Sequence, residues 1–288
     1  MELTFRMVDV FTDRPLAGNQ LCVVPDAPPG LEAELMRALA REIGFSETTF
    51  VSEAAGDRYA MRIFTPGLEM PFAGHPTLGT AFVLASEGRI TSPATQVVPA
   101  GEYSVEVDVA TGRARLLQRT YELGPVVSDR DRVARSIGLS EHDLLPELEP
   151  QVVSTGNAHL IVALRDEKAV ARAAPDTAVL VPLLKETGAG GVYLFSATGN
   201  GTAKARMFAP DVGVMEDPAT GSAAGQLGAY LAEAGAGGLP GPLLIHQGEE
   251  IGRPSELHLE ITSRDEGVDV WVEGGVAIVG RGTFELPD

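Results

Sequence analysis

Cysteine is nearly absent from this chain, and that absence excludes two kinds of structural support. The sequence holds one cysteine, Cys22, in 288 residues, so no internal disulfide can form and no cysteine-rich zinc site is available. The five histidines are scattered, and no pair stands at the spacing of metal ligands. We therefore expect no metal site, and a protein that folds by hydrophobic burial in a reducing compartment.

Basic residues are also scarce. The chain carries 40 acidic against 22 basic residues, a formal net charge of -18, which repels phosphate backbones and anionic lipid headgroups. The segment Met1–Arg6 lacks the basic and apolar regions of a signal peptide, and no later apolar run approaches the length of a membrane span. We expect a cytoplasmic protein whose partners include neither nucleic acid nor membrane.

Motifs for a nucleotide cofactor or a cysteine nucleophile are missing as well. The glycine-rich stretch 188–191 precedes an expected strand, whereas a dinucleotide-binding turn follows one. Cys22 lies within an apolar strand, where a buried thiol is a poor nucleophile. We therefore expect no cofactor.

What the chain does contain is a long series of strand-like segments. Apolar and polar residues alternate clearly over 103–109, and Gly199-Asn200-Gly201 is a hairpin signal between two such segments. The expected strands cover residues 4–11, 21–25, 48–51, 59–65, 102–109, 114–118, 159–164, 192–197, 203–208, 257–262, 268–272 and 276–284.

The expected helices are few. Leu31, Leu35, Leu39 and Ile43 recur on one helical face, and Gly44 stands where that helix would end. Segments 76–87 and 222–234 are apolar or small nearly all round, which is typical of helices that are buried on every side. We expect a sheet to wrap around each of these two helices.

The two buried helices share a sequence context, which indicates an internal repeat. In both halves an Arg-x-Phe-x-Pro segment precedes a glycine that opens the helix, and the spacing to the closing glycine is equal. A Gly-Asn pair lies upstream in each half, so four elements occur in matching order. The matching segments are Gly18-Asn19, 62–66, Gly74-His75 and Gly88 in the first half, and Gly156-Asn157, 206–210, Gly221-Ser222 and Gly235 in the second.

This repeat predicts an α+β protein of two pseudo-symmetric domains, each a β-sheet wrapped around a central buried helix. We place the N-terminal domain at residues 1–123 and the C-terminal domain at 124–288, with the last strand, about 276–286, as a candidate to complete the N-terminal domain.

The starts of the two buried helices are candidates for an anion site. Pro76 suits the first position of a helix, which makes His75 the expected N-cap, and Ser222 holds the matching place. If pseudo-symmetry brings both starts to one cleft, their unpaired backbone N–H groups and positive dipole ends can bind a small carboxylate. The alternative is that both are ordinary capped helix ends in water.

Three ionisable residues near these features are candidates for acid–base work: Glu47, His75 and Asp217. A carboxylate enclosed in an apolar cleft has a raised pKa, and a histidine beside an aspartate can be held in one tautomer. Individually, each also has an ordinary interpretation as a solvated, capping or core residue.

Several motifs resemble PhzF-like phenazine-biosynthesis proteins, and the resemblance runs from the N-terminus to about residue 255. The set is specific although each motif is short. The motifs are 9–11 with Gly18-Asn19, Phe45-Ser46-Glu47-Thr48-Thr49-Phe50-Val51, 64–66, Pro71-Phe72-Ala73-Gly74-His75-Pro76-Thr77, Glu216-Asp217-Pro218-Ala219-Thr220-Gly221-Ser222-Ala223, Gln247-Gly248 and 252–255.

The resemblance implies the diaminopimelate epimerase-like fold and a cofactor-independent isomerase. It implies that Glu47 is the principal acid/base, with His75 and Asp217 assisting, on a small unsaturated hydroxy-amino acid such as dihydro-hydroxyanthranilate. It further implies that backbone N–H groups at Gly74, His75, Gly221 and Ser222 hold the substrate carboxylate, that Asn19 binds substrate, and that the protein is a homodimer.

Two departures and two alternatives stay open. Gln20 stands where many members of the family have proline, and Ala224 where several have histidine, which leaves the substrate undetermined. With one cysteine in the chain, the two-thiol mechanism of related racemases is excluded. A non-catalytic metabolite-binding protein of the same fold, or an epimerase that uses carboxylates, remains as an alternative to the isomerase.

Overall fold

The computed structural model describes residues 1–118 and 120–286. The chain forms two compact units: unit 1 consists of Met1–Leu117 and Glu273–Asp288, and unit 2 of Gln118–Val272. We placed the domain boundary between residues 123 and 124, and that position stays a prediction.

Unit 1 is a curved sheet around one helix. In the sheet β1 pairs with β2, β3 with β4, β6 with β7 and β7 with β8, all antiparallel, whereas β2–β3 and β4–β6 are parallel. Its strands are β1 (Glu2–Val10), β2 (Asn19–Val24), β3 (Glu47–Ala55), β4 (Arg58–Phe64), β5 (Glu69–Met70), β6 (Ala94–Val98), β7 (Gly101–Asp108), β8 (Arg113–Gln118) and the larger part of β17 (Val268–Glu285).

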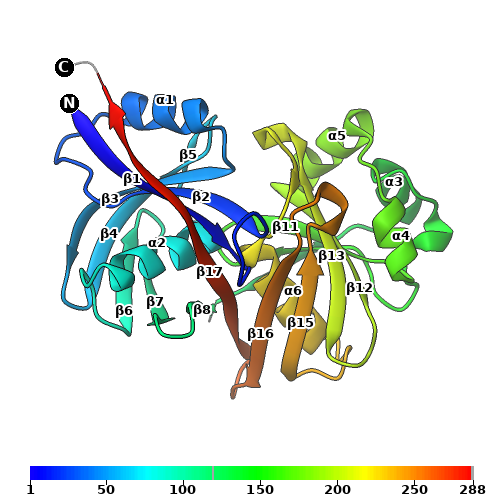
Figure 1. Ribbon diagram of the computed structural model, residues 1–288. Coiled ribbons are helices and arrows are strands. Elements are labelled where there is room, and N and C mark those ends of the chain that lie inside the picture. Colours follow the sequence, from blue (N-terminus) through cyan, green and yellow to red (C-terminus); the bar gives the residue numbers. More distant parts are fainter. Residues whose placement is uncertain (119, 287–288) are drawn as a thin grey trace. The chain divides into compact units, whose positions relative to one another are not determined.

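The helix enclosed by this sheet is α2 (Gly74–Ser86), in which every residue from Gly74 to Leu84 is buried. Figure 1 shows α2 among the strands of unit 1, with α1 (Ala33–Ile43) on the outside. The outer helix ends at Gly44, whose φ of 71° is left-handed. Its buried residues are Met36, Leu39 and Ala40, so of the four residues on the expected apolar face only Leu39 is fully buried.

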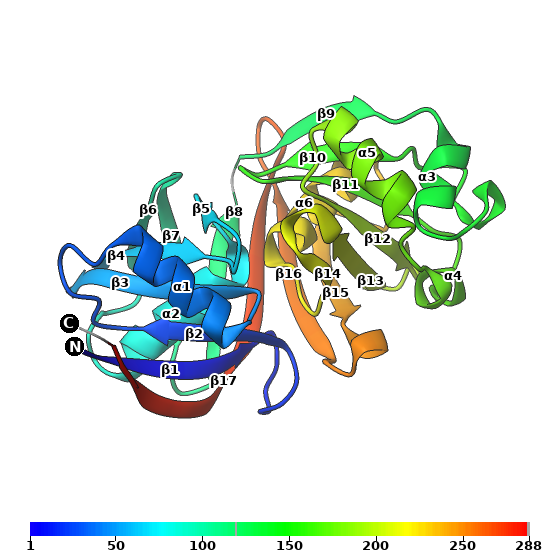
Figure 2. The ribbon, with the colours of Figure 1, turned by 90° about the horizontal axis from the view of Figure 1, so that it is seen from above.

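Unit 2 has the same plan with more helices. The buried helix is α6 (Gly221–Glu233), which Figure 2 shows among the strands of unit 2, and its residues from Gly221 to Leu231 are all buried. The strands are β9 (Glu122–Val126), β10 (Gln151–Ser154), β11 (Ala158–Ala163), β12 (Gly191–Ala197), β13 (Thr202–Ala209), β14 (Val214–Asp217), β15 (Gly241–Gln247) and β16 (Ser255–Ser263). The other helices are α3 (Arg130–Ser136), α4 (Glu167–Arg172), α5 (Thr177–Thr187) and three short 3₁₀ turns, Glu141–Asp143, Pro210–Val212 and Glu249–Ile251.

The order of strand pairing confirms the internal repeat. In unit 2, β10–β11 and β12–β13 are antiparallel, β11–β12 and β13–β15 are parallel, and β15–β16 is antiparallel. This is the order found for β1, β2, β3, β4, β6 and β7 in unit 1. In each unit the buried helix precedes the second parallel partner, α2 before β6 and α6 before β15.

A pair of contacts recurs with the repeat. Arg62 donates two hydrogen bonds to Glu69, at 2.7 and 2.6 Å, and its guanidinium lies 5.0 Å from the ring centre of Phe64. In unit 2, Arg206 binds Glu216 at 2.8 and 2.7 Å and lies 4.8 Å from the ring of Phe208. The two Arg-x-Phe segments of the sequence therefore form the same local structure in both units.

Some expectations need correction. The segments expected as two strands at 268–272 and 276–284 form one continuous strand, β17, which passes through Gly274 and Gly275. Three helices of unit 2 were missed, α3, α4 and α5, because two of them are short and α5 carries Pro182 inside it. The hairpin at 199–201 is confirmed, since Ala197 pairs with Ala203. Within the described ranges, no helix combines the length and apolar character that crossing a membrane requires.

Candidate active site

Glu47 stands at the start of β3, where its side chain is mostly covered. The parallel partner strand β2 places Leu21 opposite Glu47. The Glu47 side chain keeps 15% of its exposure, so one carboxylate lies at the edge between the unit's interior and solvent. That position suits a base that must meet a ligand without full hydration.

His75 is the second residue of α2 and is buried, with 4% relative exposure. The expectation that it caps the helix is wrong, because α2 begins at Gly74 and its N-cap is Ala73, in extended conformation with φ −152° and ψ 143°. Pro76 is thus the third helical position, where its missing N–H still falls among the groups that lack an intrahelical partner.

Asn19, His75 and Glu47 form a row of polar side chains within unit 1. The Asn19 side-chain nitrogen lies 3.2 Å from Nδ1 of His75, and Nε2 of His75 lies 3.4 Å from Oε2 of Glu47. The three residues come from the starts of β2, α2 and β3. The structure therefore brings together three of the seven site residues that the sequence indicated, around a single imidazole.

Close packing of α2 on the sheet explains why His75 reaches Asn19. At Gly79, a Cβ atom would lie 2.6 Å from the side chain of Leu21 and 2.9 Å from that of Val10. A larger residue there would force these two side chains, or the helix, to shift. The helix is thereby held against β1 and β2, and its first turn lies beside the start of β2.

Burial keeps His75 neutral. Loss of hydration lowers the pKa of this histidine from 6.5 to about 3, although a hydrogen bond with the Gln20 backbone acts in the opposite direction. The Asn19 amide nitrogen lies on the Nδ1 side of the ring, and Glu47 lies on the Nε2 side. The contact with Glu47 is therefore one between a neutral imidazole and a carboxyl group, and at neutral pH it is not an ion pair.

The start of α2 offers backbone donors. No side chain of the described residues caps this helix, and Thr77 turns its hydroxyl back to the carbonyl oxygen of Ala73 at 2.8 Å. The N–H groups of the first turn, including those of Gly74 and His75, have no partner within the helix. Such groups, with the positive end of the helix dipole, attract a carboxylate.

Asp217 is the last residue of β14 in unit 2, 8% exposed. The Thr220 hydroxyl donates to Oδ2 of Asp217 at 2.6 Å. Gln247 holds the same turn: its Nε2 donates to the Asp217 carbonyl oxygen at 2.8 Å and to Thr220 Oγ1 at 3.1 Å, and its Oε1 accepts from Tyr193 at 3.1 Å. Asp217 is thus fixed by a buried polar network of its own unit.

The start of α6 resembles that of α2 in two respects. Its N-cap is Thr220, which makes no side-chain cap hydrogen bond, and its second residue, Ser222, is 6% exposed. The expectation that Ser222 caps the helix is therefore also wrong, because the helix begins one residue earlier, at Gly221. Both helices begin at a glycine followed by one buried polar residue.

Sequence reasoning gave no role to Gln247, although the Gln247-Gly248 pair lies in one of the motifs that carry the resemblance. Gly248 has a φ of 82°, and a Cβ atom there would meet the carbonyl oxygens of Arg253 and Pro218. The pair Gln247-Gly248 is the sequence signal for this network. The pair alone does not indicate which turn the Gln247 side chain binds.

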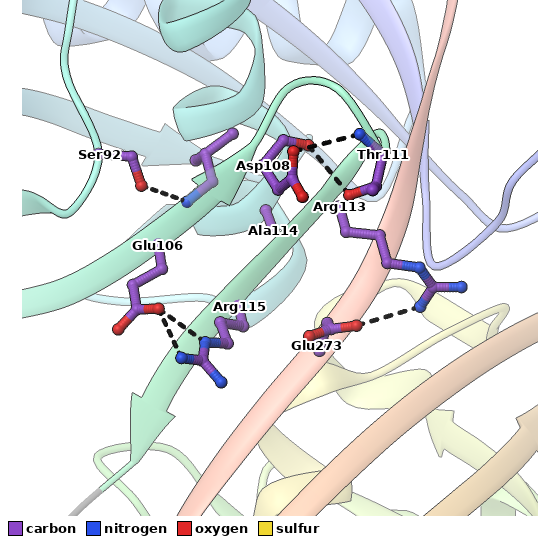
Figure 3. Close-up of a pocket in the computed structure, with 9 residues that line it drawn as sticks. Ser92, Glu106, Asp108, Thr111, Arg113, Ala114, Arg115 and Glu273 are labelled. Carbon is purple, nitrogen blue, oxygen red and sulfur yellow. Dashed lines mark hydrogen bonds and ion pairs between the residues drawn. The ribbon is translucent and has the colours of Figure 1, made fainter.

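One open hollow of about 360 Å³ lies elsewhere on unit 1 and contains none of the expected site residues. Figure 3 shows Arg115 reaching Glu106 and Arg113 reaching Glu273 across this hollow. Both arginines bind acidic partners, at 2.6 and 3.2 Å respectively. The two arginines of this hollow are both paired with carboxylates, so neither is left as an unpaired cation for an anionic ligand.

Cys22 offers no alternative nucleophile. It is buried and free, and burial raises the pKa of its thiol to about 12.

The comparisons with known proteins agree with this fold. The family model described as phenazine biosynthesis-like protein, PhzC-PhzF, matches residues 8–282. The chain belongs to this family. It is 34% identical over 287 residues, 97% of its length and 98% of the relative's, to the trans-2,3-dihydro-3-hydroxyanthranilate isomerase of Pseudomonas chlororaphis. It is 32% identical over 281 residues, 94% of each chain, to the uncharacterized isomerase YddE of Escherichia coli K12.

Solved structures give the same assignment. The Bacillus anthracis phenazine biosynthesis protein of the PhzF family has a TM-score of 0.87 at 29% identity and covers 99% of this chain and all of its own, 100%. A probable proline racemase from Agrobacterium radiobacter K84, 13% identical with 99% and 93% coverage, has a TM-score of 0.71 and shows the fold alone. The diaminopimelate epimerase-like fold is confirmed, and this member of the PhzC-PhzF family is an isomerase.

Proposed function

We propose that this isomerase moves a proton between two carbons of a small unsaturated carboxylate, with Glu47 as the group that carries the proton. The observation that supports the proposal is the row of Asn19, His75 and Glu47, in which a neutral buried imidazole lies 3.4 Å from the carboxyl group. Contacts of this kind orient the Glu47 carboxyl group, which lies where the interior of the unit meets solvent.

The chemistry is a balanced transfer. The Glu47 carboxylate accepts a proton as a C–H bond of the substrate breaks, the double bond shifts, and the Glu47 carboxyl group returns the proton to another carbon of the same molecule. Substrate and product are isomers, and no other reactant is consumed. The neutral form of His75 matters here, because a protonated imidazole at this distance would stabilise the carboxylate and weaken it as a base.

Substrate binding uses the helix starts. The N–H groups of Gly74 and His75 at the start of α2 are placed to bind the substrate carboxylate, and Asn19 binds a polar group beside it. We assign the matching role to Gly221 and Ser222 at the start of α6, and an assisting role in protonation to Asp217, on the basis of the repeat and the family motif.

The substrate class follows from the relatives. Two of them are named for trans-2,3-dihydro-3-hydroxyanthranilate, so a compact hydroxy-amino carboxylate of that kind is our first candidate. We further propose that the protein acts in the cytoplasm as a homodimer and needs no cofactor.

Replacement of Glu47 by glutamine tests the proposal. Glu47→Gln keeps the shape of the side chain but removes the proton carrier, so we expect turnover of trans-2,3-dihydro-3-hydroxyanthranilate to fall by about 10³-fold or more. The measurements are product formation by chromatography and solvent deuterium incorporation at carbon. Glu53→Gln, on the exposed part of the same strand, is the matched control and should keep full activity.

Each result distinguishes the candidate functions. An active Glu47→Gln variant would overturn the assignment of Glu47. Saturable binding without deuterium exchange in the wild type would indicate the metabolite-binding alternative, and inversion at one carbon without migration of the double bond would indicate an epimerase.

A further inference from the structure

The segment that joins β1 to β2 is built in an unusual way. It runs from Phe11 to Gly18 and ends immediately before Asn19, the residue that contacts His75. Two of its residues other than glycine have left-handed backbones, Phe11 with φ 65° and Leu16 with φ 67°. Such a backbone is strained in a residue other than glycine and persists only where the surrounding structure enforces it.

A hydrogen bond to the Asp9 carboxyl group holds the backbone of Leu16 in its left-handed conformation. This carboxyl group is 2% exposed, and its Oδ2 accepts the backbone N–H of Leu16 at 2.7 Å. The Leu16 side chain, by contrast, is 74% exposed and so gains little by burial. The left-handed conformation at Leu16 is therefore held by the hydrogen bond between its backbone N–H and Asp9. The leucine side chain does not anchor it.

Glycines close the two ends of the same segment. At its start, the N–H groups of Phe11 and Thr12 both donate to the carbonyl oxygen of Gly275, at 2.8 and 3.2 Å. A Cβ atom at Gly274 would overlap the Phe11 ring. At its end, a Cβ atom at Gly18 would overlap the Val10 carbonyl oxygen. These contacts restrict the conformation of segment 11–18, and the residue that follows this segment is Asn19.

We propose that Asp9 is a positioning residue for catalysis: by holding the backbone at Leu16, it fixes Asn19 and, through Asn19, the orientation of the His75 imidazole toward Glu47. The proposal rests on the function proposed above and adds a residue to which nothing in the mechanism has given a role. Asp9 itself touches no reacting atom.

The effect of Asp9 on His75 is transmitted in three steps. Asp9 and Asn19 lie on paired strands, since Asp9 is opposite Gln20 and Val10 opposite Asn19. The hydrogen bond from the Leu16 N–H to the buried Asp9 carboxyl group stabilises the strained backbone at Leu16. Without it the segment relaxes, Asn19 moves, and the contact between Asn19 and Nδ1 of His75 that orients the ring weakens.

The experiment compares Asp9→Ala with Asp9→Asn and with Asp13→Ala. Asp13 lies in the same segment, but its side chain is 67% exposed and its ion pair with Arg113 spans 3.4 Å, so its loss should change little. We expect Asp9→Ala to lower kcat by about 10- to 100-fold with KM nearly unchanged. Asp9→Asn keeps one acceptor oxygen for Leu16 and should recover part of the loss.

A readout that does not depend on substrate is the ¹⁵N NMR spectrum of the His75 side chain. In Asp9→Ala we expect the Nδ1 and Nε2 shifts to differ from those of the wild type, because the contact between Asn19 and Nδ1 is altered, whereas Asp13→Ala should leave them unchanged. Thermal midpoints of all variants identify any that fail to fold, and Asp9→Asn keeps the test informative if Asp9→Ala is one of them.

The possible failures are distinguishable. If Asp9→Ala and Asp9→Asn both match Asp13→Ala in kcat and in the His75 shifts while Glu47→Gln is inactive, the role of Asp9 is refuted and the proposed function stands. If Glu47→Gln is active, the proposed function fails whatever Asp9 does. Altered His75 shifts with unchanged kcat would also refute the catalytic part of the inference.

Discussion

At the scale of single residues, two buried histidines make this protein sensitive to acid. His75 is 4% exposed and His159 is 1% exposed, and loss of hydration lowers their pKa values from 6.5 to about 3 and about 4. His159 contacts Gln226 at 2.9 Å, and the Gln226 amide in turn donates to the Asn157 carbonyl oxygen. Both rings are therefore neutral in the folded protein under ordinary conditions.

A lowered pKa in the folded state fixes the direction of the pH effect. Below pH 6.5 the unfolded chain protonates these histidines and the folded chain does not, so stability is fully present above that pH and is lost as the pH falls toward about 4. Each histidine removes about 2 kcal/mol from the free energy of unfolding between about pH 7 and pH 5.

We therefore predict that His159→Gln reduces the pH dependence of stability. Glutamine keeps a hydrogen-bonding group beside Gln226 but does not titrate, so the loss between about pH 7 and pH 5 should shrink by about 2 kcal/mol. Urea unfolding at both pH values measures it. His142→Gln, at an exposed turn, is the control and should keep the wild-type loss; an equal loss in His159→Gln would contradict the prediction.

At the scale of elements, the two buried helices depend differently on their glycines. The tightest approach is at Gly79 of α2, where a Cβ atom would lie 2.6 and 2.9 Å from Leu21 and Val10. At Gly228 of α6 the nearest side-chain atoms lie farther away, at 3.2 and 3.3 Å, so small shifts of these side chains accommodate a methyl group. Alanine favours a helix over glycine by about 1 kcal/mol at both positions, so the difference isolates the packing.

Gly79→Ala should lower the free energy of unfolding by about 1–2 kcal/mol, whereas Gly228→Ala should change it by less than about 0.5 kcal/mol. Chemical unfolding of both variants measures the difference. Because α2 carries His75 toward Asn19, Gly79→Ala should also lower kcat, and Gly228→Ala should not. Equal stability of the two variants would show that α2 can move off the sheet at little cost.

The elements also show how far the sequence could be interpreted. The buried helices, the outer helix with its Gly44 end and most long strands were predictable, because apolar periodicity and glycine positions determine them locally. The exact helix starts were not, since Pro76 is compatible with more than one early position. Strands β10 and β14 have four residues each, and β5 has two, too short for a periodic signal.

The candidate site was predictable only in part. Glu47 and His75 lie 28 positions apart in the printed numbering, and their contact depends on β2–β3 pairing and on how closely Gly79 lets α2 approach the sheet. The network around Gln247 and the Asp9–Leu16 contact involve backbone atoms, which no residue pattern specifies.

At the scale of the whole molecule, both ends of the chain contribute to unit 1. β17 pairs with β1 antiparallel, from Glu2 opposite Glu285 to Val10 opposite Val276. Buried residues of β1, including Val8 and Val10, lie along this pairing, at 1% and 0% exposure. Residues 276–285 are thus a structural part of a unit whose other strands all lie before residue 119.

We predict that a chain ending at Gly275 loses the fold of unit 1, because β1 is left with an unpaired edge and its apolar side chains lose their cover. Moving residues 276–285 ahead of Met1 through a short glycine-rich linker should restore it, since Glu285 and Glu2 are paired and a tight hairpin can join them. Circular dichroism, the thermal midpoint and isomerase activity should all recover in the relocated chain. If the shortened chain is as stable as the full one, β1 needs no partner strand on that side. If the relocated chain fails to recover, the register of β17 depends on its continuity through Gly274 and Gly275, against which Phe11 packs.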